Sequence, residues 1–172
     1  MIRIAICDDD ITSIDEIYRF VCAYASTHPT IEFAVRRFHS VYDILECLES
    51  KARNFNIYLL DILMPILNGI ELGMQIRKSD AHAAIVYLTS SQEYALESFK
   101  TNPAGYLVKP VKQEAIFALL DRLCGQFERL KDSQVLVRTK DGLVNLHFHQ
   151  IFLFSHYIKH SIEYAYFFPT NA

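Results

Sequence analysis

Four groups of chemically active side chains each follow a short apolar segment of this 172-residue chain. In chain order they are Asp8-Asp9-Asp10, Asp61, Thr89-Ser90-Ser91 and Lys109. Carboxylates within a few ångströms of one another resist ionising together unless a hard cation neutralises them. Mg²⁺ suits such a place, because it takes a few carboxylates and keeps room for a phosphate oxygen. A carboxylate beside that ion can attack phosphorus and form an acyl phosphate, while a lysine and a hydroxyl bind the phosphoryl oxygens.

The elements that must position these groups alternate between two hydrophobic periods over residues 1–125. Five apolar runs are typical of strands: Ile2–Cys7, Ile31–Phe38, Ile57–Leu60, Ala84–Leu88 and Gly105–Val108. Segments with helical spacing follow them, starting near Ile11, Val41, Asn68, Glu93 and Pro110. This alternation predicts an α/β fold, a (βα)5 doubly wound parallel sheet covered by helices on both faces. Ligands of such sheets bind beyond the carboxyl ends of the strands, which is where the four groups stand.

Local signals refine the expected helices. Asp10 is suited to cap the first helix, and Asn68-Gly69 predicts a turn and a helix start. Pro110 is suited to the first helical turn, so we expect the fifth helix to begin there. The expected apolar stripe of the first helix is Ile11, Ile14, Tyr18, Val21 and Ala25.

The strand-end groups and their neighbours, taken in this order, resemble the receiver domain of two-component response regulators over residues 1–125. The matching residues are the acidic cluster Asp8-Asp9-Asp10, Asp61 with Met64-Pro65 and Asn68-Gly69, Thr89-Ser90, and Ala104-Gly105-Tyr106-Leu107-Val108-Lys109-Pro110. The resemblance implies a flavodoxin-like receiver fold in which Asp61 accepts a phosphoryl group from a cognate sensor histidine kinase. It also implies that Asp8 and Asp9 bind Mg²⁺ together with Asp61 and the main-chain carbonyl of Leu63.

Three further residues receive roles from the same resemblance. Lys109 would pair with the phosphoryl group, Thr89 would hydrogen-bond to it, and Tyr106 matches the aromatic residue that turns inward when the threonine shifts. Plainer alternatives stay open for each: a surface lysine before a helix, a hydroxyl that satisfies backbone groups, and an ordinary strand tyrosine. The resemblance implies a signalling protein that promotes its own phosphotransfer and dephosphorylation, rather than an enzyme, and one that forms a homodimer on phosphorylation.

An enzyme alternative rests on the first acidic cluster. Asp8-x-Asp10-x-Thr12 also fits the DxDxT signature of haloacid-dehalogenase-like phosphatases, with Asp8 as nucleophile and Asp10 as acid/base. Those phosphatases need an acidic pair at a later strand end, and none follows Lys109. Because the signature also leaves Asp61 unexplained, we keep this as a distant alternative.

The pattern changes near Ser133. Val135–Thr139 and Val144–Phe148 flank Asp141-Gly142 and predict a hairpin, while Ile151–Phe154 and Ile162–Phe168 predict further strands. With Tyr157-Ile158-Lys159-His160, these segments resemble the beginning of a LytTR-type DNA-binding domain. The full domain of that family is longer, so we expect a short, incomplete β-rich segment from a truncated gene or a trimmed chain. The expected organisation is a receiver over 1–125, a linker at the end of the fifth helix over 126–133, and a partial LytTR-like segment over 134–172.

Two outputs follow from this organisation. The first is regulation of transcription through the LytTR-type segment, with DNA binding possible only if that domain is complete. The second is protein–protein interaction without DNA binding, because residues 126–172 hold 5 basic and 4 acidic residues. A balance of +1 is small for binding phosphates.

Composition limits the class of protein. With 51% apolar residues, 22% charged residues and a net charge of −3, the chain is not collagen-like, low-complexity or wholly disordered. No apolar run reaches the roughly 18 residues that a bilayer requires, and the N-terminus lacks the apolar stretch of a signal peptide. The four cysteines are isolated, so we expect buried free thiols in a reducing compartment. Together these features predict a cytoplasmic protein without a membrane partner.

Overall fold

The computed structural model describes residues 1–49, 55–132, 134–139, 142–147 and 162–168. The chain divides into two compact units, Met1–Leu120 and Asp121–Ala172, which are treated separately below. Among the described residues, no helix is both long and apolar enough to cross a membrane.

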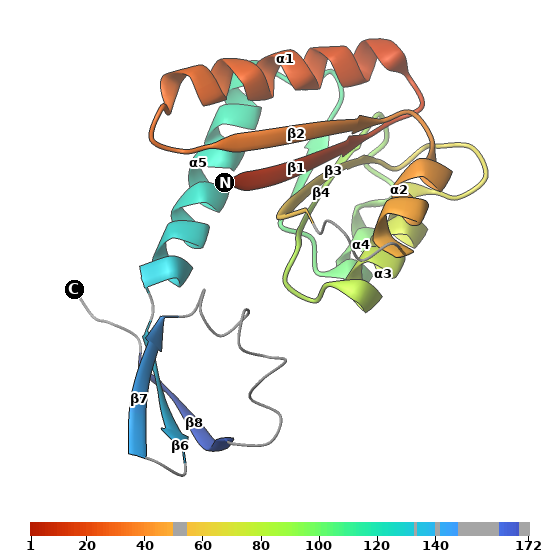
Figure 1. The fold of residues 1–172 in the computed structure, drawn as a ribbon. Coiled ribbons are helices and arrows are strands. Elements are labelled where there is room, and N and C mark those ends of the chain that lie inside the picture. Colours follow the sequence, from red (N-terminus) through yellow and green to blue (C-terminus); the bar gives the residue numbers. More distant parts are fainter. Residues whose placement is uncertain (50–54, 133, 140–141, 148–161, 169–172) are drawn as a thin grey trace. The chain divides into compact units, whose positions relative to one another are not determined.

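A five-stranded parallel sheet forms the centre of the first unit (Figure 1). Its strands are β1 (Ile2–Cys7), β2 (Phe33–Phe38), β3 (Ile57–Asp61), β4 (Ala84–Thr89) and β5 (Gly105–Val108). Their order in the sheet is β2-β1-β3-β4-β5, and all four pairings are parallel. Every residue of β3 and β4 is buried, as expected for strands covered on both faces. The predicted (βα)5 doubly wound fold is therefore confirmed.

The helices lie on both faces of this sheet (Figure 1). They are α1 (Ile11–Thr27), α2 (Val41–Glu49), α3 (Gly69–Ser79), α4 (Ala95–Ser98) with the short 3₁₀ turn η1 (Phe99–Thr101), and α5 (Gln113–Asp132). On one face Tyr24 of α1 meets Phe117 of α5 edge to face, with ring centroids 5.4 Å apart. On the other face, residues of α2 and α3 join the core formed by Tyr58, Leu60 and Tyr87.

Two helices differ from the prediction. The fifth helix does not begin at Pro110: the carbonyl of Lys112 accepts the first helical hydrogen bonds, from the amides of Ala115 and Ile116 at 3.0 and 3.3 Å. Pro110 instead lies in the loop after β5, and the Lys109–Pro110 peptide is cis. The segment expected as a helix from Glu93 to Lys100 is only α4 followed by η1.

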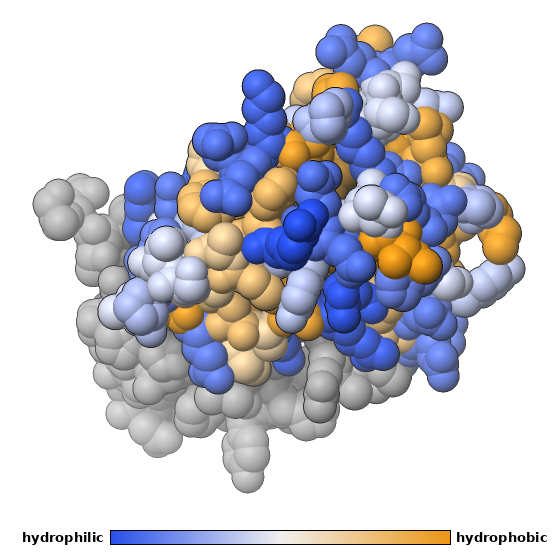
Figure 2. Space-filling view, turned by 90° about the horizontal axis from the view of Figure 1, so that it is seen from above, coloured by the Kyte–Doolittle hydropathy of each residue, from blue (hydrophilic) through white to orange (hydrophobic). Residues whose placement is uncertain are grey.

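The buried stripe of α1 also differs from the expected one. It consists of Ile14, Ile17, Val21 and Tyr24, whereas Ile11 is 61% exposed. Ile11 is the first residue of the helix. Cys22 is a free, exposed thiol outside this stripe, which corrects the expectation that every cysteine is buried. Figure 2, viewed from the side of α1, shows hydrophilic side chains interspersed with hydrophobic ones over the described part of this face.

Three antiparallel strands in the order β7-β6-β8 occupy the second unit. They are β6 (Gln134–Thr139), β7 (Gly142–His147) and β8 (Ile162–Phe168). β6 and β7 pair from Gln134↔His147 to Thr139↔Gly142. This confirms the predicted hairpin, but Gly142, expected in the turn, begins β7, and Phe148 lies outside the described residues. The expected strand at Ile151–Phe154 and the motif beginning at Tyr157 lie outside the described residues.

Candidate phosphoryl-transfer site

The sheet register brings the end of β1 next to the end of β3. Cys7 of β1 pairs with Leu60 of β3. Asp8 follows Cys7 and Asp61 follows Leu60, so these two residues meet at the carboxyl edge of the sheet. The strand order changes direction at this point, since β2 lies to one side of β1 and β3 lies to the other. This is the position at which open α/β sheets bind ligands.

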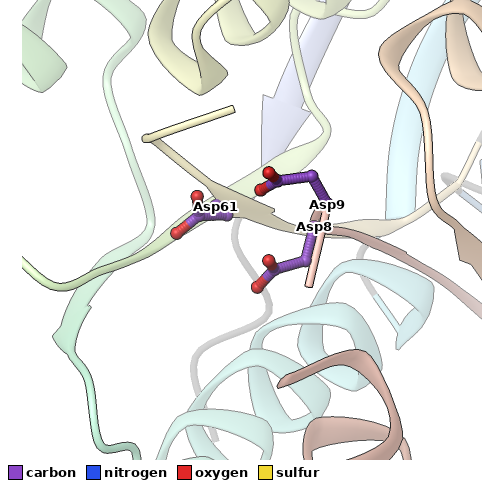
Figure 3. A group of neighbouring side chains, drawn as sticks. All are labelled: Asp8, Asp9 and Asp61. Carbon is purple, nitrogen blue, oxygen red and sulfur yellow. The ribbon is translucent and has the colours of Figure 1, made fainter. Parts of the chain in front are cut away.

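Three carboxylates gather there. Each of Asp8, Asp9 and Asp61 offers an oxygen, and these oxygens lie within 4.8 Å of one another (Figure 3). Asp8 and Asp61 are buried, with 2% and 3% of their surfaces exposed, whereas Asp9 is exposed. The cluster is therefore closed on the side of the sheet and reachable from solvent on the side of Asp9.

Lys109 bridges the two buried carboxylates. Its ammonium nitrogen lies 2.7 Å from Asp8 Oδ2 and 2.9 Å from Asp61 Oδ1. β5 delivers it to this place, because Val108 pairs with Thr89 at the end of β4 and the Lys109 amide donates to the Thr89 carbonyl at 2.7 Å. Residues separated by about a hundred positions along the chain thus form one charged group at a strand edge.

Burial and charge act against each other in this group. Burial raises the pKa of Asp8, and the hydrogen bond from Lys109 opposes that rise only in part. Burial alone would lower the pKa of Lys109, but the carboxylates of Asp8 and Asp61 outweigh it and raise that pKa. Three carboxylates facing one ammonium leave excess negative charge. An all-oxygen set of donors with this excess suits a hard divalent cation such as Mg²⁺.

The loop after β3 is closed by hydrogen bonds to one carbonyl. The oxygen of Ile62 accepts from the amide of Met64 at 3.1 Å and from the amide of Gly69 at 3.0 Å. Asn68 caps α3 by accepting from the Glu71 amide, and the Glu71 side chain accepts from the Asn68 amide in return. The helix start predicted at Asn68-Gly69 is confirmed.

Leu63, whose carbonyl the resemblance to receiver domains assigns to Mg²⁺, lies in this same loop two residues beyond Asp61 and is 44% exposed. Ile66, further along the loop, has a φ of 76°, in the left-handed region that β-branched residues rarely adopt.

Thr89 and Tyr106 lie on the β4–β5 side of the cluster. Thr89 is fully buried, and its hydroxyl accepts from the Ser91 amide at 3.2 Å. The Tyr106 hydroxyl donates to the Ser91 carbonyl at 2.7 Å. Burial raises the pKa of Tyr106, and a hydrogen bond with Thr89, which lowers it, offsets this rise only in part. The sequence did not indicate Ser91 as the residue that links this pair.

Asp10 is placed differently from its two neighbours. Its carboxylate accepts from the amides of Thr12 and Ser13 at 3.0 and 3.3 Å and caps α1, as predicted. These hydrogen bonds lower its pKa. Asp10 is not in the carboxylate cluster, so it lacks the position that the phosphatase alternative would require of its acid/base.

Two contacts near the site were not predicted. Cys7 donates to the sulfur of Met64 at 3.7 Å, and burial raises the pKa of the Cys7 thiol to about 12, so this thiol stays protonated. Gly69 is buried against the backbone at the end of β3, where no side chain would fit. Neither contact has a local sequence signal, because both join segments that only the tertiary fold brings together.

Comparison with known proteins agrees with this arrangement. Residues 4–121 match the family described as response regulator receiver domain. The positive alginate biosynthesis regulatory protein of Pseudomonas aeruginosa is 39% identical over 67 residues, which are 39% of this chain and 27% of that protein. The transcriptional regulatory protein LytR of Staphylococcus aureus strain N315 is 36% identical over 75 residues, 43% of this chain and 30% of that protein. The match thus spans less than a third of either relative's length.

A solved structure shares the fold. The response regulator protein TrrA of Thermotoga maritima, in complex with Mg²⁺-BeF, has a TM-score of 0.61 and 22% identity, covering 72% of this chain and 99% of that one.

Proposed function

Since the chain belongs to the family of response regulator receiver domains, we propose that it accepts a phosphoryl group on Asp61 from a cognate sensor histidine kinase in a two-component system. The observation that carries this proposal is the bridge from Lys109 to Asp8 and Asp61 beside Asp9. A half-buried lysine held between two buried carboxylates is ready to pair with a phosphoryl group that arrives at one of them.

The residues then take the following parts. The Asp61 carboxylate attacks phosphorus, the bond from phosphorus to the donor's nitrogen breaks, and the donor's imidazole leaves with the electron pair. The product is an acyl phosphate on Asp61. Lys109 pairs with the phosphoryl oxygens and Thr89 donates its hydroxyl to one of them, which stabilises charge that spreads over these oxygens in the transition state.

Asp8, Asp9, Asp61 and the Leu63 carbonyl would hold Mg²⁺. When bound, this ion neutralises the excess carboxylate charge and the charge of the phosphoryl oxygens. The oxygen donors within 4.8 Å support this assignment. Because the chain's own groups perform the attack and hold the product, we regard it as a signalling receiver that promotes its own phosphotransfer and dephosphorylation.

Thr89 and Tyr106 form the switch in this proposal. When Thr89 turns to the phosphoryl group, its hydroxyl gives up the hydrogen bond that it now accepts from the Ser91 amide. Tyr106, the aromatic residue assigned to turn inward, already packs partly buried against the core and donates to the Ser91 carbonyl in this structure, so Ser91 couples the two side chains. Phosphorylation would shift a pre-existing equilibrium between two arrangements of this side of the fold. Leu96 of α4 and Phe99 of η1 are large apolar residues that are 84% and 71% exposed. Because a partner could cover them, α4 and η1 are suitable for a homodimer contact.

We propose transcription regulation as the output, acting in the cytoplasm. The two relatives are named as a transcriptional regulatory protein and a biosynthesis regulatory protein. In this assignment residues 1–125 are the receiver, 126–133 the linker and 134–172 a partial LytTR-type output. A second candidate is a receiver that acts by protein–protein interaction without DNA binding, which the small positive charge of residues 126–172 favours.

Intact mass after incubation with Mg²⁺ and acetyl phosphate tests the phosphoacceptor. The native chain should gain one phosphoryl group that hydroxylamine removes, and Asp61→Asn should gain none. Asp10→Asn is the matched control, since asparagine also caps helices and this variant should react like the native chain. An adduct that survives in Asp61→Asn would overturn the proposal.

The output has a separate test. A gel shift with this chain at low salt, on promoter DNA that a full-length relative binds, should show a retarded band for a DNA-binding output. Its absence would contradict DNA binding by this chain and favour the second candidate.

A further inference from the structure

The start of α3 is pressed against the end of β3 with no room for a side chain. A Cβ built on Gly69 would overlap the carbonyl oxygen of Asp61, and it would lie 2.8 Å from the Asp61 carbonyl carbon and 3.0 Å from Ile62 Cα. These atoms belong to the backbone, so no rotation of a side chain relieves the overlap. A methyl group at this position would have to move the Asp61–Ile62 peptide or the first turn of α3.

The loop between the two elements is built to keep this contact closed. The Gly69 amide donates to the Ile62 carbonyl at 3.0 Å, and the cap formed by Asn68 fixes the first turn of α3. Ile66 holds a left-handed φ of 76° although its side chain is 79% exposed and gains little from packing. Such strain is typical of segments whose exact conformation serves a functional site.

We propose that Gly69 is a positioning residue for the phosphoacceptor site. Because it lacks a side chain, α3 can close on the peptide that carries Asp61, and this contact fixes the backbone from which the Asp61 carboxylate reaches Lys109 at 2.9 Å. The inference rests on the proposed function, and it concerns the placement of Asp61 rather than its identity as the acceptor. A displacement of about 1 Å at a reacting group can lower a rate by about a hundredfold.

α3 contains a matched control for this proposal. Gly73 is also buried, and a Cβ there would overlap the hydroxyl of Tyr87, 3.2 Å from Tyr87 Cζ and 3.3 Å from Thr101 Cγ2. These contacts belong to the core beneath α3 and not to the carboxylate cluster. Gly73→Ala therefore measures the effect of a steric clash on α3 that does not involve Asp61. A Cβ at Gly125 would meet no atom within 4 Å, so Gly125→Ala measures the effect of exchanging glycine for alanine without any clash.

The experiment measures three quantities on the full chain and the three variants: the urea midpoint, the dissociation constant of MgCl₂ by calorimetry, and the initial rate of phosphorylation by acetyl phosphate. Gly69→Ala and Gly73→Ala should both lower the midpoint. Only Gly69→Ala should also weaken Mg²⁺ binding and slow phosphorylation, each by about tenfold or more. Gly125→Ala should change neither binding nor rate.

Equal Mg²⁺ affinities and rates for folded Gly69→Ala and Gly73→Ala would overturn the inference. If Gly69→Ala does not fold, Asn68→Ala takes its place, since it loosens the same turn by removing the cap; an unchanged Mg²⁺ affinity in that variant would also overturn it. Failure of the proposed function is distinguishable, because the native chain would then remain unphosphorylated. In that event the Mg²⁺ affinities alone decide the role of Gly69.

Discussion

Replacing Lys109 by methionine removes the cation that two buried carboxylates share. Its ammonium lies 2.7 Å from Asp8 and 2.9 Å from Asp61, whose side chains are 2% and 4% exposed. Breaking a buried ion pair from one side costs about 3–5 kcal/mol. Because the Lys109 side chain is still 21% exposed, we expect the free energy of unfolding to fall by an amount near the lower end of this range, about 3 kcal/mol.

The measurement is urea unfolding without Mg²⁺ at neutral pH. With a slope of about 2 kcal/mol per molar urea, the midpoint of Lys109→Met should fall by about 1.5 M. Lys112→Met is the matched control, an exposed lysine three residues away that should shift the free energy of unfolding by less than about 0.5 kcal/mol. Added Mg²⁺ should return part of the lost stability, because a ligand that binds only the folded state stabilises it. Equal midpoints for the two variants would refute the electrostatic account of the site.

Three further predictions concern other parts of the first unit. The Arg77 guanidinium lies 2.7–3.4 Å from five backbone carbonyl oxygens and donates hydrogen bonds to this set, three before β4 and two at the end of η1: Asp80, Ala81, Ala83, Thr101 and Asn102. Arg77→Ala should therefore lower the free energy of unfolding by about 3 kcal/mol, measured in urea, while Lys78→Ala leaves it nearly unchanged; similar losses in both would contradict this role. Asp10→Ala should lower the free energy of unfolding by about 1 kcal/mol, because it removes the cap of α1. Equal melting temperatures for Asp10→Ala and Asp10→Asn would contradict a capping role, since asparagine can still cap the helix. Burial raises the pKa of Tyr58 and Tyr87 above 10, so the folded state holds these protons longer than the unfolded state. The contribution of these two tyrosines to stability should be fully present below about pH 10 and be lost as pH rises further, with part of the phenolate absorbance appearing only on unfolding; titration of all tyrosines in one step near pH 10 would disagree.

The sequence predicted most of the first unit because its strands and helices have strong, separate periods. Strands such as Ile2–Cys7 and Gly105–Val108 match the prediction at both ends. The carboxyl ends of parallel strands lie along one edge of the sheet. The positions of Asp8, Asp61 and Lys109 at strand ends were therefore enough to predict that they meet.

Other features depend on tertiary contacts that no local pattern carries. The start of α5 at Gln113 follows from where the first helical hydrogen bonds form, and Pro110 alone did not indicate this. The link from Thr89 through Ser91 to Tyr106 joins a loop to a neighbouring strand. The contact of Gly69 with Asp61 depends on the depth at which α3 packs, which composition and spacing do not specify.

The most direct test of the central claim is to locate the phosphoryl group. Borohydride reduces an aspartyl phosphate to homoserine, so treating the acetyl-phosphate-labelled native chain with borohydride and sequencing its peptides by mass spectrometry marks the acceptor. We predict homoserine at position 61 and aspartate at positions 8, 9 and 10. Homoserine at position 8, with Asp61 unchanged, would contradict the account and support the phosphatase alternative, in which Asp8 is the nucleophile.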